Sequence, residues 1–239
     1  MAKILITGST EGLGFLAAKR LVAEGNEVVL HARNSKRAQD VLKKLPQVKG
    51  IVIGDLSSIK EVKSLAVQIN QLGTFDTIIY NAGVDSSDTD LTFRVNDLAP
   101  YMLTALVGHP KRIIYVSSGM HQGANLDIDN LSQTTNYSSS KLQILMFAKA
   151  VARYYPKITV TSVDPGWVPT RMGGKGATDN LEQGYSSQVW LATLDDPSVS
   201  GNYYYHQKLE NYDSRVDRHK LQDAYVEKLG EITGIPLNR

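Results

Sequence analysis

The chain has no cysteine, no long apolar run and no block of like charges. The absence of cysteine from its 239 residues excludes disulfides, thiolate metal sites and cysteine nucleophiles. No apolar run approaches the ~18 residues of a membrane-spanning helix. The net charge is +2, and no run of Lys and Arg exceeds two residues, so nucleic-acid binding is not indicated.

Targeting and metal-binding signals are also scarce. The start, MAKILITG, lacks an apolar segment with a small-residue cleavage site and leads directly into a predicted strand. We therefore expect a cytoplasmic protein with no membrane partner, in which the sequons at Asn130 and Asn136 are chance matches. His109, His121 and His206 are scattered without a second ligand at metal spacing, so no metal site is predicted.

Short β-rich runs alternate with helical patterns along the chain. Several runs are continuous Ile/Val stretches, which are typical of strands buried on both faces of a parallel sheet. Seven strands are predicted, at Lys3–Thr7, Glu27–Ala32, Gly50–Gly54, Thr77–Tyr80, Arg112–Ser117, Thr159–Val163 and Asn202–Tyr205. The helices predicted between them are one that carries Leu13, Leu16, Ala17 and Leu21 on one face and ends at Gly25-Asn26, then Ser35–Leu45, Ser57–Leu72, Asp90–Val107 and Tyr137–Tyr154.

This alternation predicts the α/β class. With right-handed crossovers it gives a single-domain Rossmann fold over residues 1–239, with a doubly wound, mostly parallel seven-stranded sheet and helices on both faces. The stretch from Gly166 to Asn180 breaks the rhythm, because three of the residues between 173 and 176 are glycine, and it is predicted to be a mobile loop. We expect the segment 166–183 to shape a substrate pocket and residues 206–239 to form a C-terminal extension.

A glycine-rich segment, Thr7-Gly8-Ser9-Thr10-Glu11-Gly12-Leu13-Gly14, follows the first strand and opens the first helix. Gly8 permits a tight turn, Gly12 lets backbone N–H groups approach a pyrophosphate, and Gly14 lets helix and strand pack closely. The N-terminus of the following helix favours binding of the pyrophosphate anion. A plain glycine-rich turn is the alternative, but the position in a βαβ unit favours a dinucleotide site. Its predicted cofactor-binding residues are Gly8, Ser9, Thr10, Glu11, Gly12, Leu13 and Gly14.

The residues after the second and third strands bear on which dinucleotide binds. An acidic residue after the second strand would bind a ribose 2′-OH, whereas an arginine suits a 2′-phosphate. His31-Ala32-Arg33-Asn34 offers no carboxylate, so Arg33 predicts NADP(H), with NAD(H) as the weaker alternative. An exposed strand-end charge is the other interpretation of Arg33. His31 could contact the adenine or the 2′-phosphate, but an ordinary strand-end histidine is the plainer interpretation. In Asp55-Leu56 the carboxylate suits an adenine amino group, a helix N-cap, or both.

The segment Tyr137-Ser138-Ser139-Ser140-Lys141 places a phenol and an amine four residues apart. Residues at this spacing share one face of a helix. A lysine ammonium near a phenol favours the phenolate, so it is expected to lower the pKa of Tyr137 toward neutral pH. A tyrosine of this kind can give or take a proton at a carbonyl or alcohol oxygen.

Seven features together resemble the classical short-chain dehydrogenase/reductase family. They are TGSTEGLG, DL at 55–56, NAG at 81–83, Asn96, the serine pair at 117–118, YSSSK and PG at 165–166. The resemblance covers nearly the whole chain in the correct order. The GxxxGxG spacing fits the classical branch rather than the extended, epimerase-like one. SSGMHQGANLDIDNL and the tail SGNYYYHQKLENY also resemble retinol dehydrogenase-like members.

The resemblance implies residue roles. Tyr137 is the catalytic acid/base, Lys141 is its electrostatic partner and nicotinamide-ribose ligand, and Ser118 hydrogen-bonds the substrate oxygen. Asn96 holds the water of a proton relay with Lys141, although it could instead satisfy backbone groups at a helix bend. The further cofactor contacts implied are Asn81, Ala82, Gly83, Pro165, Gly166, Val168 and Thr170.

These residues predict an NADP(H)-dependent oxidoreductase that transfers a hydride between nicotinamide and a small carbonyl or alcohol substrate. The alternative is a sensor or scaffold protein that binds NADP without turnover, but the intact Tyr and Lys argue for chemistry. An epimerase or dehydratase on the same fold is disfavoured by the glycine spacing.

Three features depart from the family pattern. The negative charge of Glu11 would repel a nearby 2′-phosphate. The spacing around Asn96 suggests a shortened fourth helix, which leaves open the homodimer that relatives form through it. The N-terminal membrane segment common in retinol-type relatives is not seen in this sequence.

Overall fold

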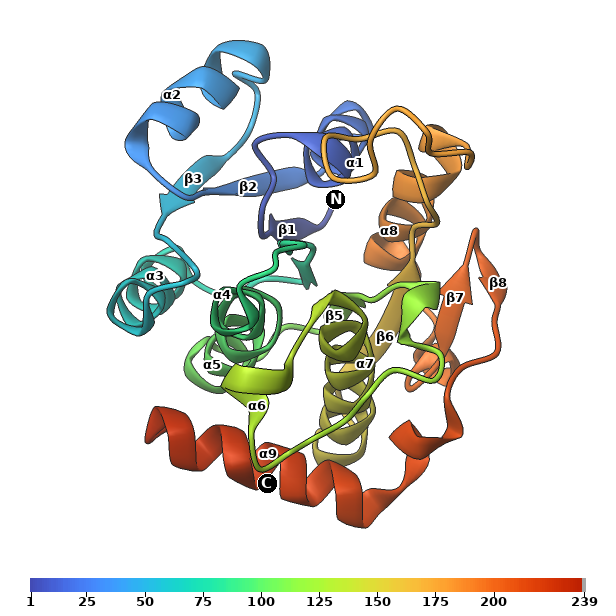
Figure 1. Ribbon diagram of the computed structural model, residues 1–239. Coiled ribbons are helices and arrows are strands. Elements are labelled where there is room, and N and C mark those ends of the chain that lie inside the picture. The colour runs from blue at the N-terminus through green and yellow to red at the C-terminus, as the bar shows by residue number, and fades with distance from the viewer. Residues whose placement is uncertain (238–239) are drawn as a thin grey trace.

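The molecule is built on a central β-sheet with helices packed on both sides (Figure 1). The computed structural model describes residues 1–237. Its strands are β1 (Lys3–Ile6), β2 (Glu27–Ala32), β3 (Gly50–Ile53), β4 (Thr77–Tyr80), β5 (Arg112–Val116), β6 (Thr159–Asp164), β7 (Tyr203–Tyr205) and β8 (Lys208–Leu209). They are ordered β3-β2-β1-β4-β5-β6-β7-β8, and β1 to β7 run parallel. This is the predicted doubly wound sheet, with its switch point between β1 and β4.

The prediction of seven strands is wrong by one. All seven are present, with ends that differ by one residue at most, but β8 adds a short antiparallel pairing to β7. His206 and Gln207 form the turn between β7 and β8 with φ angles of 46° and 63°. This hairpin could not be predicted from the sequence, because its turn contains no glycine and both residues of β8 are exposed.

The helices connect and cover the strands. They are α1 (Gly12–Ala23), α2 (Ser35–Lys44), α3 (Ile59–Gln71), α4 (Thr89–Phe93), the π-helical turn η1 (Arg94–Leu98), α5 (Ala99–Leu106), the 3₁₀ turn η2 (Gly119–His121), α6 (Leu131–Thr134), α7 (Tyr137–Tyr154), α8 (Leu181–Thr193), the 3₁₀ turns η3 (Pro197–Val199) and η4 (Ser214–Asp217), and α9 (His219–Thr233). The helix predicted over Asp90–Val107 is interrupted by η1. The predicted substrate segment 166–183 includes the first turn of α8. Neither α8 nor α9 was among the predicted helices. Among residues 1–237, no helix is both long and apolar enough to cross a membrane.

Side-chain caps fix where most of the long helices begin. Asn34, Ser58, Asn136 and Asn180 each accept a hydrogen bond from a backbone N–H in the first turn of the helix that follows. Helix α1 differs, because Glu11 occupies its N-cap position without a side-chain hydrogen bond. The N–H groups of its first turn are therefore left for another acceptor.

Alternate strand residues face opposite sides of the sheet. Ile4 and Ile6 pack with residues of α1, α2 and α8, whereas Leu5 between them packs with residues of α3, α5 and α7. Ile78 and Ile79 divide between the two faces in the same way. Each such side chain contributes roughly 1.5–3 kcal/mol when it is fully buried. Burial on both faces explains the unbroken Ile/Val runs of the sequence.

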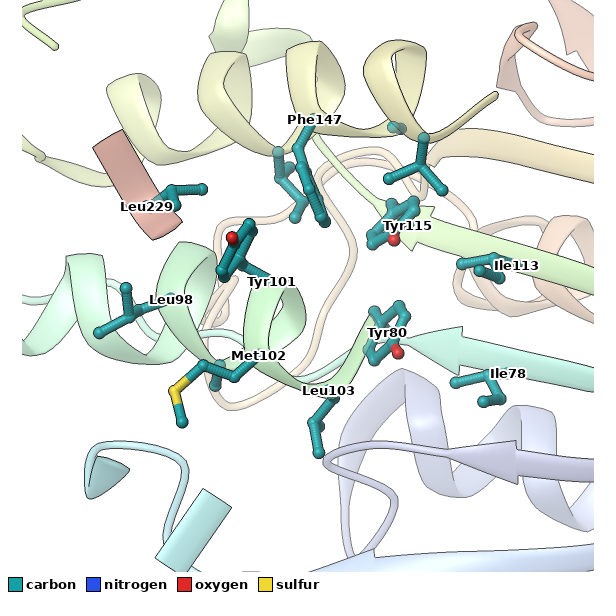
Figure 2. Close-up of a cluster of buried hydrophobic side chains, with 14 of the residues drawn as sticks. Ile78, Tyr80, Leu98, Tyr101, Met102, Leu103, Ile113, Tyr115, Phe147 and Leu229 are labelled. Carbon is teal, nitrogen blue, oxygen red and sulfur yellow. The ribbon is translucent and has the colours of Figure 1, made fainter. Parts of the chain in front are cut away.

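Aromatic packing holds α7 on the sheet. Figure 2 shows Phe147 of α7 above Tyr115 of β5, which lies beside Tyr80 of β4. The rings of Tyr80 and Tyr115 stack with centroids 5.0 Å apart, and Phe147 meets Tyr115 edge-on at 5.6 Å. Leu229 of α9 belongs to the same core. Because α7 begins at Tyr137, this packing fixes the direction in which the proposed catalytic residues project.

Candidate active site

The glycine-rich turn after β1 is joined to the Asn81-Ala82-Gly83 segment after β4. Thr7 Oγ1 accepts hydrogen bonds from the backbone N–H groups of Asn81 and Ala82, each at 3.0 Å. Gly8 has a φ of +63°, and a Cβ there would lie 2.8 Å from Ala82 Cα. Only glycine therefore fits, and the two segments meet at the switch point between β1 and β4. Thr7 was not singled out in the sequence, although it begins the motif.

The turn is tightly packed at Gly14 and open at Gly12. A Cβ on Gly14 would lie 2.4 Å from Asn81 Nδ2, which donates to the carbonyls of Thr7 and Gly8. A Cβ on Gly12, where φ is +59°, would meet nothing nearer than Thr170 at 4.0 Å. The open side coincides with the uncapped N-terminus of α1. These residues fit a pyrophosphate, because they leave space and unpaired N–H donors at one place.

Arg33 lies exposed just beyond β2, close enough to Glu11 of the glycine turn for its charge to act on that carboxylate. Asp55 accepts hydrogen bonds from the N–H and hydroxyl of Ser57, while Ser58 caps α3. The interpretation of Asp55 as the N-cap of α3 is therefore wrong. Leu56 beside it is buried.

Glu11 lies among arginines from three segments. Arg37 of α2 donates to Glu11 Oε1 at 2.9 Å, and Arg171 lies 3.8 Å from the same oxygen. The hydrogen bond from Arg37 lowers the pKa of Glu11, and the charges of Arg171 and Arg33 act in the same direction. A cavity of about 350 Å³ lies between Thr10-Glu11 and helix α2, from its N-cap Asn34 to its last residue, Lys44. Arg37 was not predicted as part of this region.

Tyr137 and Lys141 occupy the first two turns of α7. Asn136 caps the helix by accepting from Ser139 N–H at 2.9 Å. The Lys141 ammonium lies 5.3 Å from the centroid of the Tyr137 ring and donates to the Val116 carbonyl at 3.0 Å. Helix capping thus places the phenol, and a backbone carbonyl of β5 holds the amine beside it.

The two serines at the end of β5 make different contacts. Ser117 donates to the Lys141 carbonyl at 2.7 Å, which ties β5 to α7. Ser118 lies near the Tyr137 phenol and acts to lower its pKa. The carbonyl of Ser118 accepts from His121 Nδ1 at 2.7 Å, and His121 Nε2 accepts from Asp213 N–H. The C-terminal extension therefore supports the loop that presents Ser118.

Asn96 lies in the π-helical turn and binds backbone groups of Val84. Its Oδ1 accepts from Val84 N–H at 2.8 Å, and its Nδ2 donates to the Val84 carbonyl and to Ser140 Oγ. A Cβ on Gly83 would lie 3.5 Å from both Asn96 Oδ1 and Lys141 Nζ, so these residues are neighbours. The interpretation of Asn96 as a residue that satisfies backbone groups is confirmed, and its part in a water relay stays a prediction.

The pKa values differ from the sequence-based expectation. Burial raises the pKa of Tyr137 to about 12; the nearby Ser118 side chain opposes the rise, and the charges of Asp164 and Asp85 add to it. Burial lowers the pKa of Lys141 to about 8, against the opposing charges of Asp97 and Asp164. The expectation that Lys141 lowers the Tyr137 pKa toward neutral is wrong for the protein's own side chains, because desolvation dominates.

Asp164 organises the loop after β6, and nothing in the sequence singled it out beyond its place before Pro165. Its carboxylate accepts from Gly119 N–H and from Gly166 N–H, both at 2.8 Å. Gly166 has a φ of +79°, and a Cβ there would lie 2.4 Å from Asp179 Oδ2. Asp179 in turn accepts from Trp167 N–H at 2.7 Å. These contacts close the base of the loop next to Ser118.

Within the same loop, Val168 is buried and its carbonyl accepts from Thr170 N–H at 2.7 Å. Thr170 is also the nearest neighbour of the space above Gly12. The structure therefore brings the predicted residues after Pro165 next to the glycine-rich turn. The predicted mobility of the loop stays a prediction.

A buried carboxyl lies behind the site. Asp97, next to Asn96, accepts from the Tyr225 hydroxyl of α9 at 3.3 Å, and its Oδ2 has no hydrogen-bond partner among the described residues. Burial raises the pKa of Asp97 well above its usual value, while the charge of Lys141 opposes that rise. The sequence could not reveal this pair, because its members are 128 positions apart.

The open glycine turn lies at the switch point of a doubly wound sheet, and Ser118, Tyr137 and Lys141 lie together at the same edge of that sheet. This is the arrangement of a Rossmann-type oxidoreductase. The family model for short chain dehydrogenases matches residues 2–180. The chain belongs to this family, and it is an oxidoreductase that acts on the CH–OH/C=O pair.

Individual proteins agree with this assignment. The chain is 39% identical to the short-chain dehydrogenase chyC of Penicillium rubens over 99% of both chains. It is 27% identical to human retinol dehydrogenase 13 over 71% of this chain and 60% of that protein, which confirms the weaker likeness seen in the sequence. The NADPH-bound carbonyl reductase from chicken fatty liver shares the fold, with a TM-score of 0.74 and 22% identity over 89% of this chain and 99% of that chain.

Proposed function

We propose that the protein is an NADP(H)-dependent reductase or dehydrogenase of small carbonyl or alcohol compounds, with Tyr137 as its acid/base. The observation that carries the proposal is that Ser118 and Lys141 both neighbour Tyr137, with Ser118 near the phenol and the Lys141 ammonium 5.3 Å from the centroid of its ring. The three groups come from two elements that meet at the carboxyl edge of the sheet, where α/β proteins bind ligands.

In the reductive direction Tyr137 acts as the acid. Its pKa of about 12 keeps the phenol protonated at neutral pH. Ser118 and Tyr137 hydrogen-bond the carbonyl oxygen, and Tyr137 gives its proton to the developing alkoxide. The Lys141 charge stabilises the phenolate that remains. A water held near Asn96 and Lys141 returns the proton. When bound, the nicotinamide supplies or accepts the hydride.

In the oxidative direction the phenol must lose its proton first. Burial disfavours the phenolate, so this direction depends more strongly on the charge of Lys141. The pKa of Lys141, at about 8, keeps most of that charge at neutral pH.

NADP(H) is the proposed cofactor because its 2′-phosphate would enter a basic surrounding. Arg33 and Arg37 lie near Glu11, whose carboxylate is already paired by Arg37 and Arg171. The pairing reduces the repulsion that an isolated Glu11 would exert on a phosphate. The chicken carbonyl reductase of the same fold binds NADPH, which is in accord with this choice.

The remaining cofactor contacts follow the resemblance. Asp55 would accept from the adenine amino group, with Leu56 beside it at the cofactor. Asn81, Ala82 and Gly83 would line the cofactor, and Pro165, Gly166, Val168 and Thr170 would bracket the nicotinamide carboxamide. We propose that residues 166–183 shape the substrate pocket and that the described part of the C-terminal extension, residues 206–237, supports it. The cytoplasmic location and the homodimer stay predictions of the sequence.

The proposal is tested by following NADPH absorbance with a panel of aldehydes and ketones. Turnover that requires both NADPH and a carbonyl compound is expected, with a larger kcat/KM for NADPH than for NADH. NADPH binding without turnover of any carbonyl or alcohol in the panel would instead favour the sensor or scaffold alternative. Epimerised or dehydrated products, with no net change in the oxidation state of the cofactor, would instead favour an epimerase or dehydratase on the same fold.

A further inference from the structure

A buried histidine joins the two loops that flank the proposed adenosine site. His31 lies in β2 and is 3% exposed. Its Nδ1 accepts a hydrogen bond from Gly8 N–H at 3.0 Å, within the glycine-rich turn. Its Nε2 lies 2.8 Å from the carbonyl oxygen of Gly54, which directly precedes Asp55. One imidazole ring therefore bridges the ends of β1 and β3.

The backbone partners fix the protonation state of the ring. A backbone N–H can only donate and a carbonyl can only accept, so Nδ1 must carry a lone pair and Nε2 must carry the hydrogen. The main chain of His31 adds to the connection, since its N–H donates to Ser9 Oγ at 3.0 Å and its carbonyl accepts from Ser9 N–H. Ser9 Oγ also donates to the Ile6 carbonyl at 2.8 Å.

We infer that His31, in its neutral Nε2–H form, is a positioning residue for the dinucleotide site, and that it holds the Gly8-Ser9 turn in register with the Gly54-Asp55 loop. The inference rests on the proposed function in so far as a dinucleotide binds across these loops. His31 is buried and does not need to touch the cofactor.

Protonation would break the bridge at Gly8. A hydrogen on Nδ1 would face the hydrogen of Gly8 N–H, leaving two donors without an acceptor. Burial lowers the pKa of His31 from its ordinary 6.5, while the Gly54 carbonyl and the nearby Asp55 carboxylate oppose that shift. The ring is therefore neutral at physiological pH. Cofactor affinity is expected to fall as the pH falls through the lowered His31 pKa, below 6.5.

The first test reads the tautomer directly. Nitrogen-15 NMR of the histidine side chains in the full chain, with His31→Asn used for assignment, is expected to show an unprotonated Nδ1 and a protonated Nε2 for His31 at neutral pH. An Nδ1–H tautomer or an imidazolium at that pH would overturn the inference. This result does not depend on any enzymatic activity.

The second test uses two variants that each keep half of the bridge. An Asn amide reaches the position of Nδ1, whereas a Gln amide reaches the position of Nε2. NADPH affinity is expected to fall about tenfold in His31→Gln and His31→Leu and by less than about threefold in His31→Asn. The acid-side loss of affinity should disappear in His31→Asn.

Several outcomes separate this inference from the proposed function. If His31→Leu does not fold, the Asn and Gln pair alone decides the question. Equal NADPH affinity in all variants, or an Asn variant as weak as the Gln variant, would overturn the positioning role while leaving the proposed function intact. A wild-type protein that binds no dinucleotide would overturn both, with turnover assays and the NMR result distinguishing the two failures.

Discussion

The choice between NADP(H) and NAD(H) depends on the charges around Arg33, and Arg33→Ala tests it. Arg33 is exposed at the end of β2 and lies near Glu11, Arg37 and Arg171. A hydrogen bond to a charged group contributes about 1.5–3 kcal/mol. Solvent screens an exposed guanidinium, so we reduce this to about 1–2 kcal/mol. The dissociation constant for NADPH should then rise about 5- to 30-fold in Arg33→Ala.

The assay is fluorescence or calorimetric titration of wild type and variant with NADPH and NADH. The NADH constant should change little, because NADH has no 2′-phosphate. Arg20→Ala is the matched control, since Arg20 is an exposed arginine in the last turn of α1. The effect of Arg33→Ala should shrink at high salt. Glu11→Gln should tighten NADPH binding, because it removes a negative charge and releases Arg37 from its ion pair.

Tighter binding of NADH than of NADPH by the wild type would refute this reasoning. An unchanged NADPH constant in Arg33→Ala would show that the arginine is only an exposed strand-end charge, which is the alternative that the sequence left open.

Three further predictions follow from the site. Because the pKa of Lys141 is lowered from 10.5 to about 8, kcat/KM for reduction should fall as the pH rises above about 8. The free energy of unfolding should rise between pH 8 and 10.5, because Lys141 binds more protons in the unfolded chain than in the folded one over this range. Lys141→Arg should abolish the fall in kcat/KM, and an unchanged inflection in this variant would assign the fall to another group. Gly14→Ala should lower the free energy of unfolding by about 1–3 kcal/mol in urea titrations, because its Cβ would clash with Asn81 Nδ2, whereas Gly50→Ala, with nothing within 4 Å, serves as the control. Amide hydrogen exchange at residues 173–176 should slow when NADPH and a substrate are both present, since ordering three glycines requires contacts from a ligand; equal exchange with and without them would show that the loop is not a lid.

The sequence predicted the parts of the site that depend on short spacings. Gly8, Gly12 and Gly14 lie in one turn, and Tyr137 and Lys141 lie in one helix, so local geometry places each group. The strands were predicted within one residue for a similar reason, because burial on both faces leaves an uninterrupted apolar run.

Contacts between distant segments were not predictable. The Asp97–Tyr225 hydrogen bond spans 128 positions and joins the C-terminal helix to the region behind Lys141. His31 looked like an ordinary strand-end histidine, because neither Gly8 nor Gly54 shows in the sequence that its backbone faces an imidazole. Such contacts depend on how strands are ordered in the sheet.

The wrong expectation for Tyr137 has a different cause. Charge proximity is visible in a YxxxK spacing, whereas desolvation depends on everything that surrounds the side chain. At Tyr137 burial exceeds the stabilisation that a nearby ammonium was expected to give. The direction of a pKa shift at a half-buried site therefore required the structure.

The most direct test of Tyr137 as the acid/base is the single-turnover rate of hydride transfer in Tyr137→Phe, measured with saturating NADPH and a carbonyl substrate found in the panel. The variant removes only the phenolic oxygen. The rate should fall by about 10²–10⁴-fold, while the dissociation constant for NADPH stays within about twofold. Tyr204→Phe, which removes a phenol of β7 that accepts a hydrogen bond from Asn202, should leave the rate unchanged. A Tyr137→Phe rate above about one per cent of the wild-type rate would contradict the assignment.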